Sequence, residues 1–234
     1  MIPVLTKSNP IARKILNESF ILLLDKEEGW TSFDVVKKLR GLLRIRKIGH
    51  AGTLDPFASG LLIIGVGKAT RHLSQYVYAV KKYRAVIRFG AETDTYDKTG
   101  ELLNTCPTES INISDIEGTL TKLKGPIEQV PPMYSAKKVQ GRRLYELARK
   151  KIVVERTPVL VNIYDVAVLE WENPRLCLEL KVSKGTYIRS YAHDLGQLLG
   201  CGAHLEELRR LAIGDMTVEE SFKMVEFREY WSEN

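Results

Sequence analysis

The chain has 234 residues, 44% hydrophobic and 27% charged, with a net charge of +6 at pH 7, as expected of a soluble globular protein with a substantial core. Its longest apolar run is too short to cross a bilayer, and its first residues lack the basic start and apolar stretch of a signal peptide. Its three cysteines are an odd number without CxxC spacing, which argues against a disulfide framework or a zinc site and fits a reducing cytoplasm.

The first half of the chain shows three regular patterns. Residues 31–43 have apolar side chains at helical spacing, with Thr31 or Ser32 as the N-cap, and predict a helix. The uninterrupted apolar run at 61–67 predicts a buried strand, and the alternating stretch 83–90 predicts a half-buried strand.

The second half of the chain predicts a hairpin and a helix. Residues 161–171 and 175–183 alternate over their length, with a turn at 172–174 between them. Residues 186–200 keep helical spacing, and Gly200 suits the end of the helix. Because strands and helices intermix without a regular βαβ rhythm, we expect an α+β fold with a mixed, mainly antiparallel sheet flanked by helices.

Basic residues are segregated along the chain. The stretch 35–50 holds six bases and no acid, and the stretch 129–151 holds seven bases against Glu146 alone. The second stretch belongs to a proline-rich segment at about 126–153, which we expect to be a surface insertion made of a loop and a helix. Segregated charge suits a polyanion bound on one face, although solvated helix faces give the same pattern.

Asp55 is a candidate catalytic residue. It precedes Pro56, which disfavours a helical conformation at the aspartate, and neighbouring glycines let the backbone bend tightly. A carboxylate held there could be a nucleophile, a general base or only a hydrogen-bond acceptor in a turn. The chain has no P-loop, dinucleotide fingerprint or nucleophile elbow, and its four histidines lack metal-ligand spacing. If the protein is an enzyme, we therefore expect an acid to act without cofactor or metal.

The ordered motifs of the chain resemble those of the bacterial tRNA pseudouridine-55 synthase family. The resemblance extends from about Leu22 to Leu211 and is strongest in GHAGTLDPFASGLL, which begins at Gly49. The other motifs follow in the family's order and are KKYR from Lys81, TDTYDKTG from Thr93, VPPMYSAKKVQGRRLYELAR from Val130, SKGTYIRS from Ser183 and GCGAHLEELRR from Gly200.

The resemblance implies the pseudouridine synthase fold and the isomerisation of one uridine, at position 55 in the T loop of tRNA. The bond from C1′ to N1 is broken, the uracil turns while it is held, and a bond from C1′ to C5 replaces the first. The reaction has no net redox change and no second substrate, which agrees with the lack of cofactor and metal motifs. A carboxylate would either attack the nucleotide or remove a proton from the sugar.

The resemblance also implies the site residues. Asp55 is the catalytic aspartate, and Arg189 is the arginine that pairs with it and lowers its pKa. Tyr83 stacks on the flipped-out base, and His50 contacts the flipped region of the T loop. The other implied contacts are Tyr187 and Leu208 with the nucleotide, and Lys81, Lys82, Arg84 and the bases of the insertion with phosphates.

Two departures from the family pattern bear on the organisation of the chain. Glu27 stands where the family's early motif has a proline, and only about 20 residues follow LRRLAIG, too few for the PUA-type RNA-binding domain that many members carry. We therefore expect a single catalytic domain over 1–234, with no separate C-terminal RNA-binding domain. We expect it to act in the cytoplasm on the T arm of tRNA, without membrane contact or an obligatory protein partner.

Three other interpretations of the sequence stay open. The chain could be a guide-dependent relative that works inside a small-RNA–protein complex, against which the missing PUA-type domain counts. It could be a non-catalytic RNA chaperone, which would use the same basic insertion and stacking tyrosine but would be indifferent to Asp55→Asn. It could also be a generic basic α+β protein, which leaves the ordered motifs without a cause.

Overall fold

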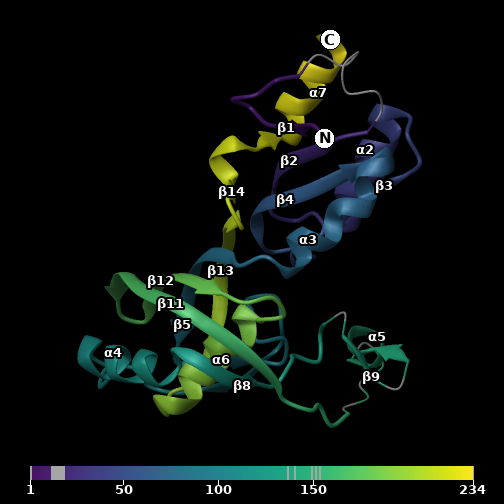
Figure 1. The fold of residues 1–234 in the computed structure, drawn as a ribbon. Helices are drawn as coiled ribbons and strands as arrows, with labels where there is room; N and C mark the ends of the chain where they lie inside the picture. Colours follow the sequence, from purple (N-terminus) through teal and green to yellow (C-terminus); the bar gives the residue numbers. More distant parts are fainter. Residues whose placement is uncertain are drawn as a thin grey trace. The chain divides into compact units, whose positions relative to one another are not determined.

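The structure is a computed structural model (Figure 1) that describes residues 2–11, 19–135, 137–139, 141–148, 150, 152 and 154–233. The chain forms two compact units. Unit 1 consists of Met1–Tyr83 and Leu208–Asn234, and unit 2 consists of Arg84–Glu207. Strands β5 (Lys81–Phe89) and β13 (Ala203–Ile213) each run from one unit into the other. The single domain expected over 1–234 stays a prediction.

Unit 1 is a sheet covered by helices on both faces. Its elements before Tyr83 are β1 (Val4–Leu5), β2 (Ile21–Lys26), α2 (Ser32–Leu43), β3 (Ile48–Ala51), β4 (Ser59–Val66), a 3-10 helix (Gly67–His72) and α3 (Leu73–Tyr78). After Leu208 come the end of β13, β14 (Met216–Thr217), a 3-10 helix (Val218–Glu220), β15 (Phe222–Lys223) and α7 (Met224–Glu233).

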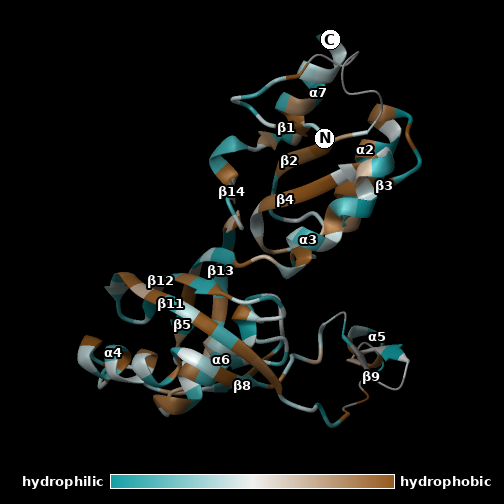
Figure 2. Cartoon of the chain, in the orientation of Figure 1, coloured by the Kyte–Doolittle hydropathy of each residue, from teal (hydrophilic) through white to brown (hydrophobic). Residues whose placement is uncertain are grey.

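The strands of unit 1 pair in both senses. β2 runs antiparallel to β4 and parallel to β1 and β15. β4 runs antiparallel to β3 and, at its start, parallel to the end of β13. Figure 2 shows β2 and β4 as the hydrophobic strands of the unit. Both faces of this sheet are buried, which explains why residues 60–66 of β4 are apolar without interruption.

Each face of the unit 1 sheet has its own core. Alternate residues of β2 and β4 point to opposite faces, so that Leu22 and Ile64 join one cluster and Leu23 and Ile63 join the other. The buried side chains that cover the first face come from α2 and α7 and include Val35, Val36, Leu39, Leu43, Phe227 and Trp231. Those that cover the second include Ala69, Leu73, Ile213 and Val218.

Helix α2 begins and ends where the sequence predicts. Thr31 is its N-cap and forms a capping box with Asp34, in which each side chain bonds to the backbone N–H of the other residue. Arg44 ends the helix in the left-handed conformation, with φ of 57°. Thr31 rather than Ser32 is therefore the capping residue, and the Ser32 side chain serves another purpose described below.

Unit 2 is an antiparallel sheet with helices α4 and α6 in contact with each other. Its elements after β5 are β6 (Ala91–Thr93), β7 (Leu102–Thr105), α4 (Ile113–Lys122), β8 (Gly125–Gln129), β9 (Lys138–Val139), β10 (Arg142–Arg143), α5 (Leu144–Ala148), β11 (Val159–Glu172), β12 (Arg175–Val182) and α6 (Ile188–Leu198). β11 pairs antiparallel with β12 and with β8, which confirms the predicted hairpin, and β5 lies beside β12 in the sheet. The predicted mixed, mainly antiparallel α+β fold is confirmed.

The segment predicted as an insertion contains more regular structure than a loop and a helix. It opens with β8, which joins the sheet edge, and continues to a small antiparallel hairpin of β9 and β10 followed by α5. Figure 1 shows α5 and β9 at the end of a long connection from β8. Arg149, Lys151 and Val153 of this segment lie outside the described residues.

Candidate active site

Asp55 lies in the loop of residues 52–58 that joins two antiparallel neighbours, β3 and β4. We call this segment the Asp55 loop. The Ala58 N–H donates to the Asp55 carbonyl at 3.1 Å, which closes a turn directly after the acid. Gly52, with φ of +81°, supplies a left-handed conformation at the start of the loop. The Asp55 side chain is half-buried.

Three residues around the start of α2 hold the Asp55 loop. The Ser32 hydroxyl accepts from the Leu54 N–H at 2.9 Å and donates to the Leu54 carbonyl at 3.3 Å. The Gly29 N–H donates to the Pro56 carbonyl at 2.8 Å. The buried Lys26 ammonium donates to the same carbonyl at 3.3 Å. The residues on both sides of Asp55 are therefore tied to the DKEEGW segment and its helix.

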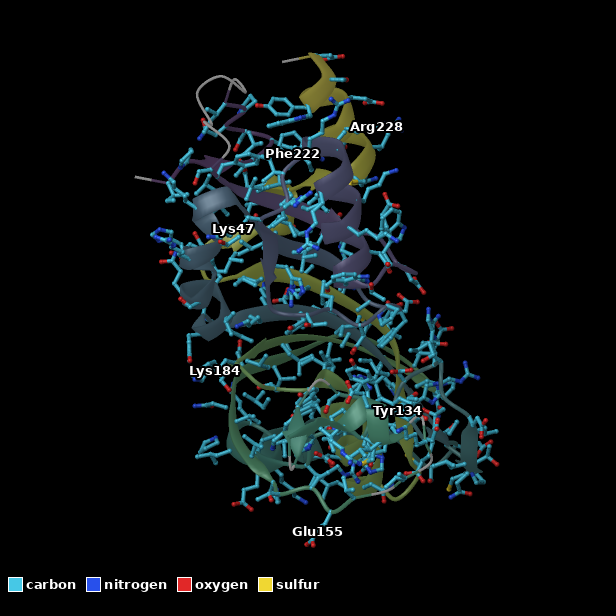
Figure 3. The ribbon with its side chains drawn as sticks, turned by 90° about the vertical axis from the view of Figure 1, so that its right-hand side faces the viewer. Lys47, Tyr134, Glu155, Lys184, Phe222 and Arg228 are labelled. Atoms are coloured by element: carbon cyan, nitrogen blue, oxygen red, sulfur yellow. The ribbon has the colours of Figure 1, made fainter. Side chains whose placement is uncertain are left out.

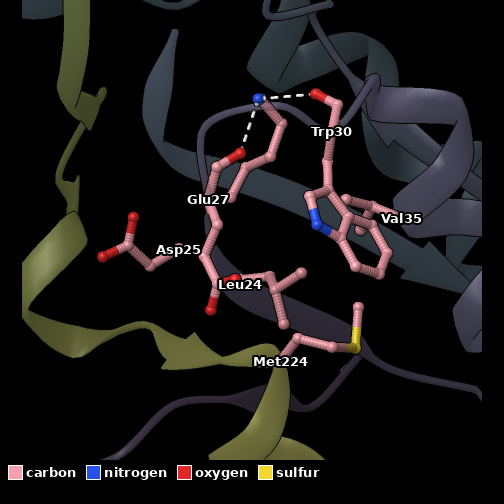
Figure 4. A pocket seen from close by; sticks show the side chains of 7 residues that line it. Leu24, Asp25, Glu27, Trp30, Val35 and Met224 are labelled. Atoms are coloured by element: carbon pink, nitrogen blue, oxygen red, sulfur yellow. Dashed lines mark hydrogen bonds between the residues drawn. The ribbon is translucent and has the colours of Figure 1, made fainter. Parts of the chain in front are cut away.

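Lys26 is a buried cation beside the acid. Its ammonium also donates to the carbonyls of Glu27 at 2.9 Å and Trp30 at 2.7 Å, as Figure 4 shows. Burial lowers the pKa of Lys26 to about 8, and the negative charge of Asp55 opposes this effect. Because Glu27 contributes its backbone carbonyl here, the side chain that replaces the family's proline leaves this contact intact.

A second buried cation, Arg210 of β13, also bonds to the backbone around Asp55. Its guanidinium donates to the carbonyls of Leu61 at 2.8 Å, Gly52 at 3.1 Å and Thr53 at 3.5 Å. Burial and, next, the charge of Arg210 lower the pKa of His50, which favours its neutral form. The buried Nδ1 of His50 has no hydrogen-bond partner within the described part of the chain.

Two further predicted residues of unit 1 are largely buried. Tyr83 is 9% exposed and lies on the inward side of β5, together with Ala85, Ile87 and Phe89. Leu208 on β13 is 8% exposed. The stacking role of Tyr83 and the pocket role of Leu208 stay predictions.

In unit 2, Arg189 lies in the first turn of α6, and its side chain is 4% exposed. Its guanidinium donates to the carbonyls of Thr95 at 3.1 Å and Tyr134 at 2.8 Å. One guanidinium nitrogen is also 3.6 Å from a carboxylate oxygen of Asp97, which is equally buried. Asp55 and Arg189 belong to different units, and their predicted pairing stays a prediction.

Asp97 organises the turn that faces Arg189. One of its carboxylate oxygens accepts from the hydroxyls of Thr95 at 2.9 Å and Thr99 at 2.5 Å and from the Thr99 N–H at 2.9 Å. The other oxygen is the one near Arg189. Asp97 was not among the site residues predicted from the sequence, although four hydroxyl-bearing residues around two aspartates are the typical signal of such a turn.

Tyr187 is the residue at which α6 begins. Its N–H donates to the side-chain oxygen of Gln129 at 2.8 Å, and its carbonyl accepts from the Gln129 amide at 3.1 Å. Gln129, the last residue of β8, is 1% exposed. Gln129 on β8 thus fixes the backbone that carries the half-buried Tyr187 side chain. No local sequence pattern predicts this role for Gln129.

The basic residues differ in what their side chains do. The six bases of 35–50, on α2 and the loop after it, are exposed. Lys47 is one of them (Figure 3). Phe33 on the same helix is 61% exposed, with the Arg40 guanidinium 6.0 Å from its ring centre. Arg84 is exposed and donates to the Cys177 sulfur at 3.3 Å.

Lys81 corrects the predicted set of phosphate contacts. Its side chain is 7% exposed, and its ammonium donates to the carbonyls of Tyr76 at 3.2 Å, Val77 at 2.5 Å and Ala79 at 2.6 Å. These carbonyls end helix α3, where a cation is favoured by the helix dipole. Lys81 is therefore a helix-capping residue, and its ammonium is turned inward rather than toward RNA.

Within the described ranges, no group of three His, Cys, Asp or Glu side chains could hold a metal ion. The helices in that part of the chain are too short or too polar to span a membrane. The chemistry that these residues can perform is that of a carboxylate in a constrained turn, close to two buried cations.

The fold and the match to family models place the chain in the class of RNA pseudouridine synthases. Over residues 40–188 the chain matches the family model described as TruB family pseudouridylate synthase (N terminal domain), and over 189–234 that of the tRNA pseudouridylate synthase B C-terminal domain. The chain belongs to the TruB family and is an isomerase that forms pseudouridine.

Curated relatives named tRNA pseudouridine synthase B cover most of this chain. The protein from Aquifex aeolicus is 46% identical over 88% of this chain and 72% of its own length. The protein from Chlamydia muridarum is 46% identical over 86% of this chain and 83% of its own length. The protein from Solibacter usitatus is 45% identical over 86% of this chain and 69% of its own length.

Solved structures of similar fold confirm the architecture. A chain of a Cbf5–Nop10–Gar1 complex aligns with a TM-score of 0.70 and 29% identity, over 92% of this chain and 54% of that one. A chain of an H/ACA RNP bound to a substrate RNA containing 2′-deoxyuridine aligns with a TM-score of 0.70 and 26% identity, over 97% of this chain and 58% of that one.

Proposed function

We propose that this protein converts the uridine at position 55 in the T loop of tRNA to pseudouridine, with Asp55 as the catalytic carboxylate. The observation that carries the proposal is the Asp55 loop. It belongs to the motif that most resembles the family, and it is held by bonds from Gly29, Ser32, Lys26 and Arg210. A carboxylate placed this firmly is suited to act on one atom of a bound nucleoside.

The residues of the chain can supply every group that the reaction needs. The C1′–N1 bond breaks, uracil turns while it is bound, and C1′ bonds to C5. The C5 proton then leaves, and N1 gains one, so that composition and oxidation state are unchanged. Asp55 acts either by attacking the nucleotide or by taking a proton from the sugar, and both routes begin with the ionised carboxylate. No cofactor or metal takes part.

The remaining site residues act on the RNA. Arg189 pairs with Asp55 in the complex, and Tyr83 stacks on the flipped-out uracil. His50 contacts the flipped region of the T loop in its neutral form, and Tyr187 and Leu208 line the nucleotide pocket. The exposed bases of 35–50 contact phosphates, which position the RNA without reading its sequence.

The enzyme acts in the cytoplasm on the T arm of tRNA and without an obligatory protein partner. The identity of about 45% to proteins named tRNA pseudouridine synthase B, against 29% to the chain of the Cbf5–Nop10–Gar1 complex, favours this over a guide-dependent enzyme. Turnover of a bare tRNA transcript by the purified protein tests this point, because a guide-dependent enzyme would leave such a transcript unmodified.

The decisive experiment incubates the protein with a T-arm stem-loop and maps pseudouridine by carbodiimide adducts, since isomerisation leaves the mass unchanged. We expect one modified position in the loop, and none with Asp55→Asn, although that variant still binds the RNA. Asp215→Asn, which neutralises an exposed acid of the same unit, serves as the matched control and keeps full activity. Equal activity of the two variants would refute the role of Asp55 and favour an RNA chaperone.

A further inference from the structure

Arg210 connects both ends of the Asp55 loop. Two of its carbonyl acceptors, Gly52 and Thr53, precede Asp55, and the third, Leu61, follows it on β4. The guanidinium group has donors in a rigid plane, so three bonds of this kind fix the separation of the two loop ends. Arg210 is 1% exposed, and this geometry is therefore not loosened by solvent.

The backbone of Arg210 also contacts the chain directly after the Asp55 loop. Arg210 pairs with Gly60 in the parallel ladder between β13 and β4. A Cβ atom at Gly60 would come within 2.3 Å of the Arg210 carbonyl oxygen, and Gly60 has φ of +107°. Only glycine permits both this approach and this conformation. Backbone and side chain of one residue thus define where β4 starts after the loop.

Within the described residues, the Arg210 guanidinium bonds to carbonyl oxygens and forms no ion pair, so its charge is not neutralised by a carboxylate there. Its neighbour Arg209 differs, since Arg209 pairs with Asp25 at 2.7 Å. The other ionisable groups around the loop are Asp25 and Lys26 at the end of β2, Glu28 after it, His50 on β3 and Asp55 itself. Asp55 and Arg210 both act on Lys26, with opposite effects on its pKa, and the Arg210 guanidinium bonds to the Thr53 carbonyl, two residues before Asp55.

We propose that Arg210 is a positioning residue for the catalytic carboxylate: it fixes both ends of the Asp55 loop, and its charge favours the ionised form of Asp55. The inference rests on the proposed function for the role of Asp55 and assigns a role to Arg210 within it. A buried cation stabilises a nearby carboxylate over the neutral acid. Arg210 belongs to unit 1, the same unit that carries the Asp55 loop.

The test compares Arg210→Met, which removes the charge, with Arg210→Lys, which keeps the charge but lacks the planar guanidinium whose separate nitrogens bond to both sides of the loop. Arg209→Met is the matched control, because it removes a neighbouring arginine whose partner is Asp25. For each variant we would measure the single-turnover rate on the T-arm stem-loop against pH, the RNA dissociation constant, and the Asp55 titration by carboxyl-carbon NMR.

For Arg210→Met we expect a rate lower by about 100-fold, as a misplaced catalytic group produces, with the RNA dissociation constant changed by less than threefold. The acid limb of its pH–rate profile and the pKa of Asp55 should rise by about one unit. Arg210→Lys should keep the acid limb of the wild type with an intermediate rate, and Arg209→Met should match the wild type in both.

A folded Arg210→Met protein with the wild-type rate and acid limb would overturn the inference. If Arg210→Met does not fold, Arg210→Lys decides: a wild-type rate overturns the inference, and a lower rate with an unchanged acid limb supports it. Should the wild type form no pseudouridine, the proposed function fails. The NMR titration of Asp55 then still tests the effect of Arg210, since it requires no activity.

Discussion

Ser32 and Leu54 are joined by two hydrogen bonds, one in each direction, between a buried hydroxyl and the backbone of the residue before Asp55. Through this pair the first turn of α2 fixes the backbone that carries the carboxylate. The neighbouring Thr31 caps the same helix but makes no contact with the loop that the structure records. Of these two adjacent hydroxyl residues, Thr31 therefore stabilises the helix and Ser32 stabilises the Asp55 loop.

Ser32→Ala should lower both stability and rate, because it leaves the buried N–H and carbonyl of Leu54 without their partner. The expected loss is about 1–3 kcal/mol of unfolding free energy, together with a clear fall in the single-turnover rate. Thr31→Ala should cost about 1 kcal/mol through the lost cap and leave the rate unchanged. Urea unfolding and rate measurements on both variants check this, and equal rates would contradict it.

Arg189→Lys should slow the reaction far more than it weakens RNA binding. The variant keeps a cation near Asp97 but loses the planar group that reaches Thr95 and Tyr134 together. We expect a rate loss of more than tenfold and a dissociation constant within threefold of the wild type. Equal losses in rate and in affinity would show that Arg189 only binds RNA.

Arg189→Ala should in addition destabilise unit 2. It removes the cation beside Asp97, whose side chain is 5% exposed, and an uncompensated buried charge costs about 3–5 kcal/mol. Asp97→Asn on top of Arg189→Ala should recover part of this loss, since it removes the charge that is left. Denaturant unfolding of the single and double variants measures the recovery, and its absence would mean that the two residues do not interact.

RNA affinity should fall steeply with salt, because the proposed function has the exposed bases of 35–50 contact phosphates. The logarithm of the binding constant should decline with that of the salt concentration by about 0.7–0.9 for each neutralised phosphate. Replacing both Lys38 and Lys47 by Gln should reduce this slope, whereas Lys223→Gln near α7 should not. A slope close to zero in the wild type would remove the electrostatic part of the proposal.

Lys81 and Lys82 should separate stability from RNA binding. Lys81→Met leaves the carbonyls at the end of α3 without their cation, and it should lower the melting temperature with little change in affinity. Lys82→Met changes the adjacent, half-buried lysine and should weaken RNA binding with little change in melting temperature. The reverse result would restore Lys81 as a phosphate contact.

Asp194 on α6 should make the protein less stable as pH rises from about 4 to about 6. Burial raises the pKa of Asp194 to about 6, whereas an unfolded aspartate titrates near 3.8. Between these values the folded state holds a proton that the unfolded state has lost, so ionisation above them opposes folding. Asp194→Asn should therefore raise the melting temperature at pH 7.5 and leave it nearly unchanged at pH 4. An equal change at both would contradict this.

Periodic patterns in the sequence identify the elements that are long enough to show them. Helix α2 and the β11–β12 hairpin lie where spacing and turn residues predict, because each buries one regular face. The strands β9 and β10 have two residues each, too few for any period to register. Fold class was predictable for the same reason, since it depends on the order of the long elements.

The candidate site was predictable only in part, because its supports come from distant positions. Asp55 stands out through its motif, but the bonds of Ser32, Arg210 and Gln129 are set by tertiary packing that no local pattern contains. The burial of Lys81, in contrast, could have been predicted from the sequence. Lys81 lies on the same side of the alternating strand β5 as Tyr83, Ala85 and Ile87, which is the buried side. Only its charge suggested a role at the surface.

Unit 1 is made from both ends of the chain, and this division determines when the Asp55 loop can be completed during protein synthesis. Leu61 and Arg210, which hydrogen-bond to each other, are 149 positions apart, and the whole of Arg84–Glu207 emerges from the ribosome between them. Until β13 and α7 are translated, the N-terminal strands therefore lack the part of each core that Ile213, Val218, Phe227 and Trp231 supply. Nascent chains halted before Leu208 would hold the Asp55 loop with its bonds from Ser32, Gly29 and Lys26, but without the Arg210 bonds that join its two sides.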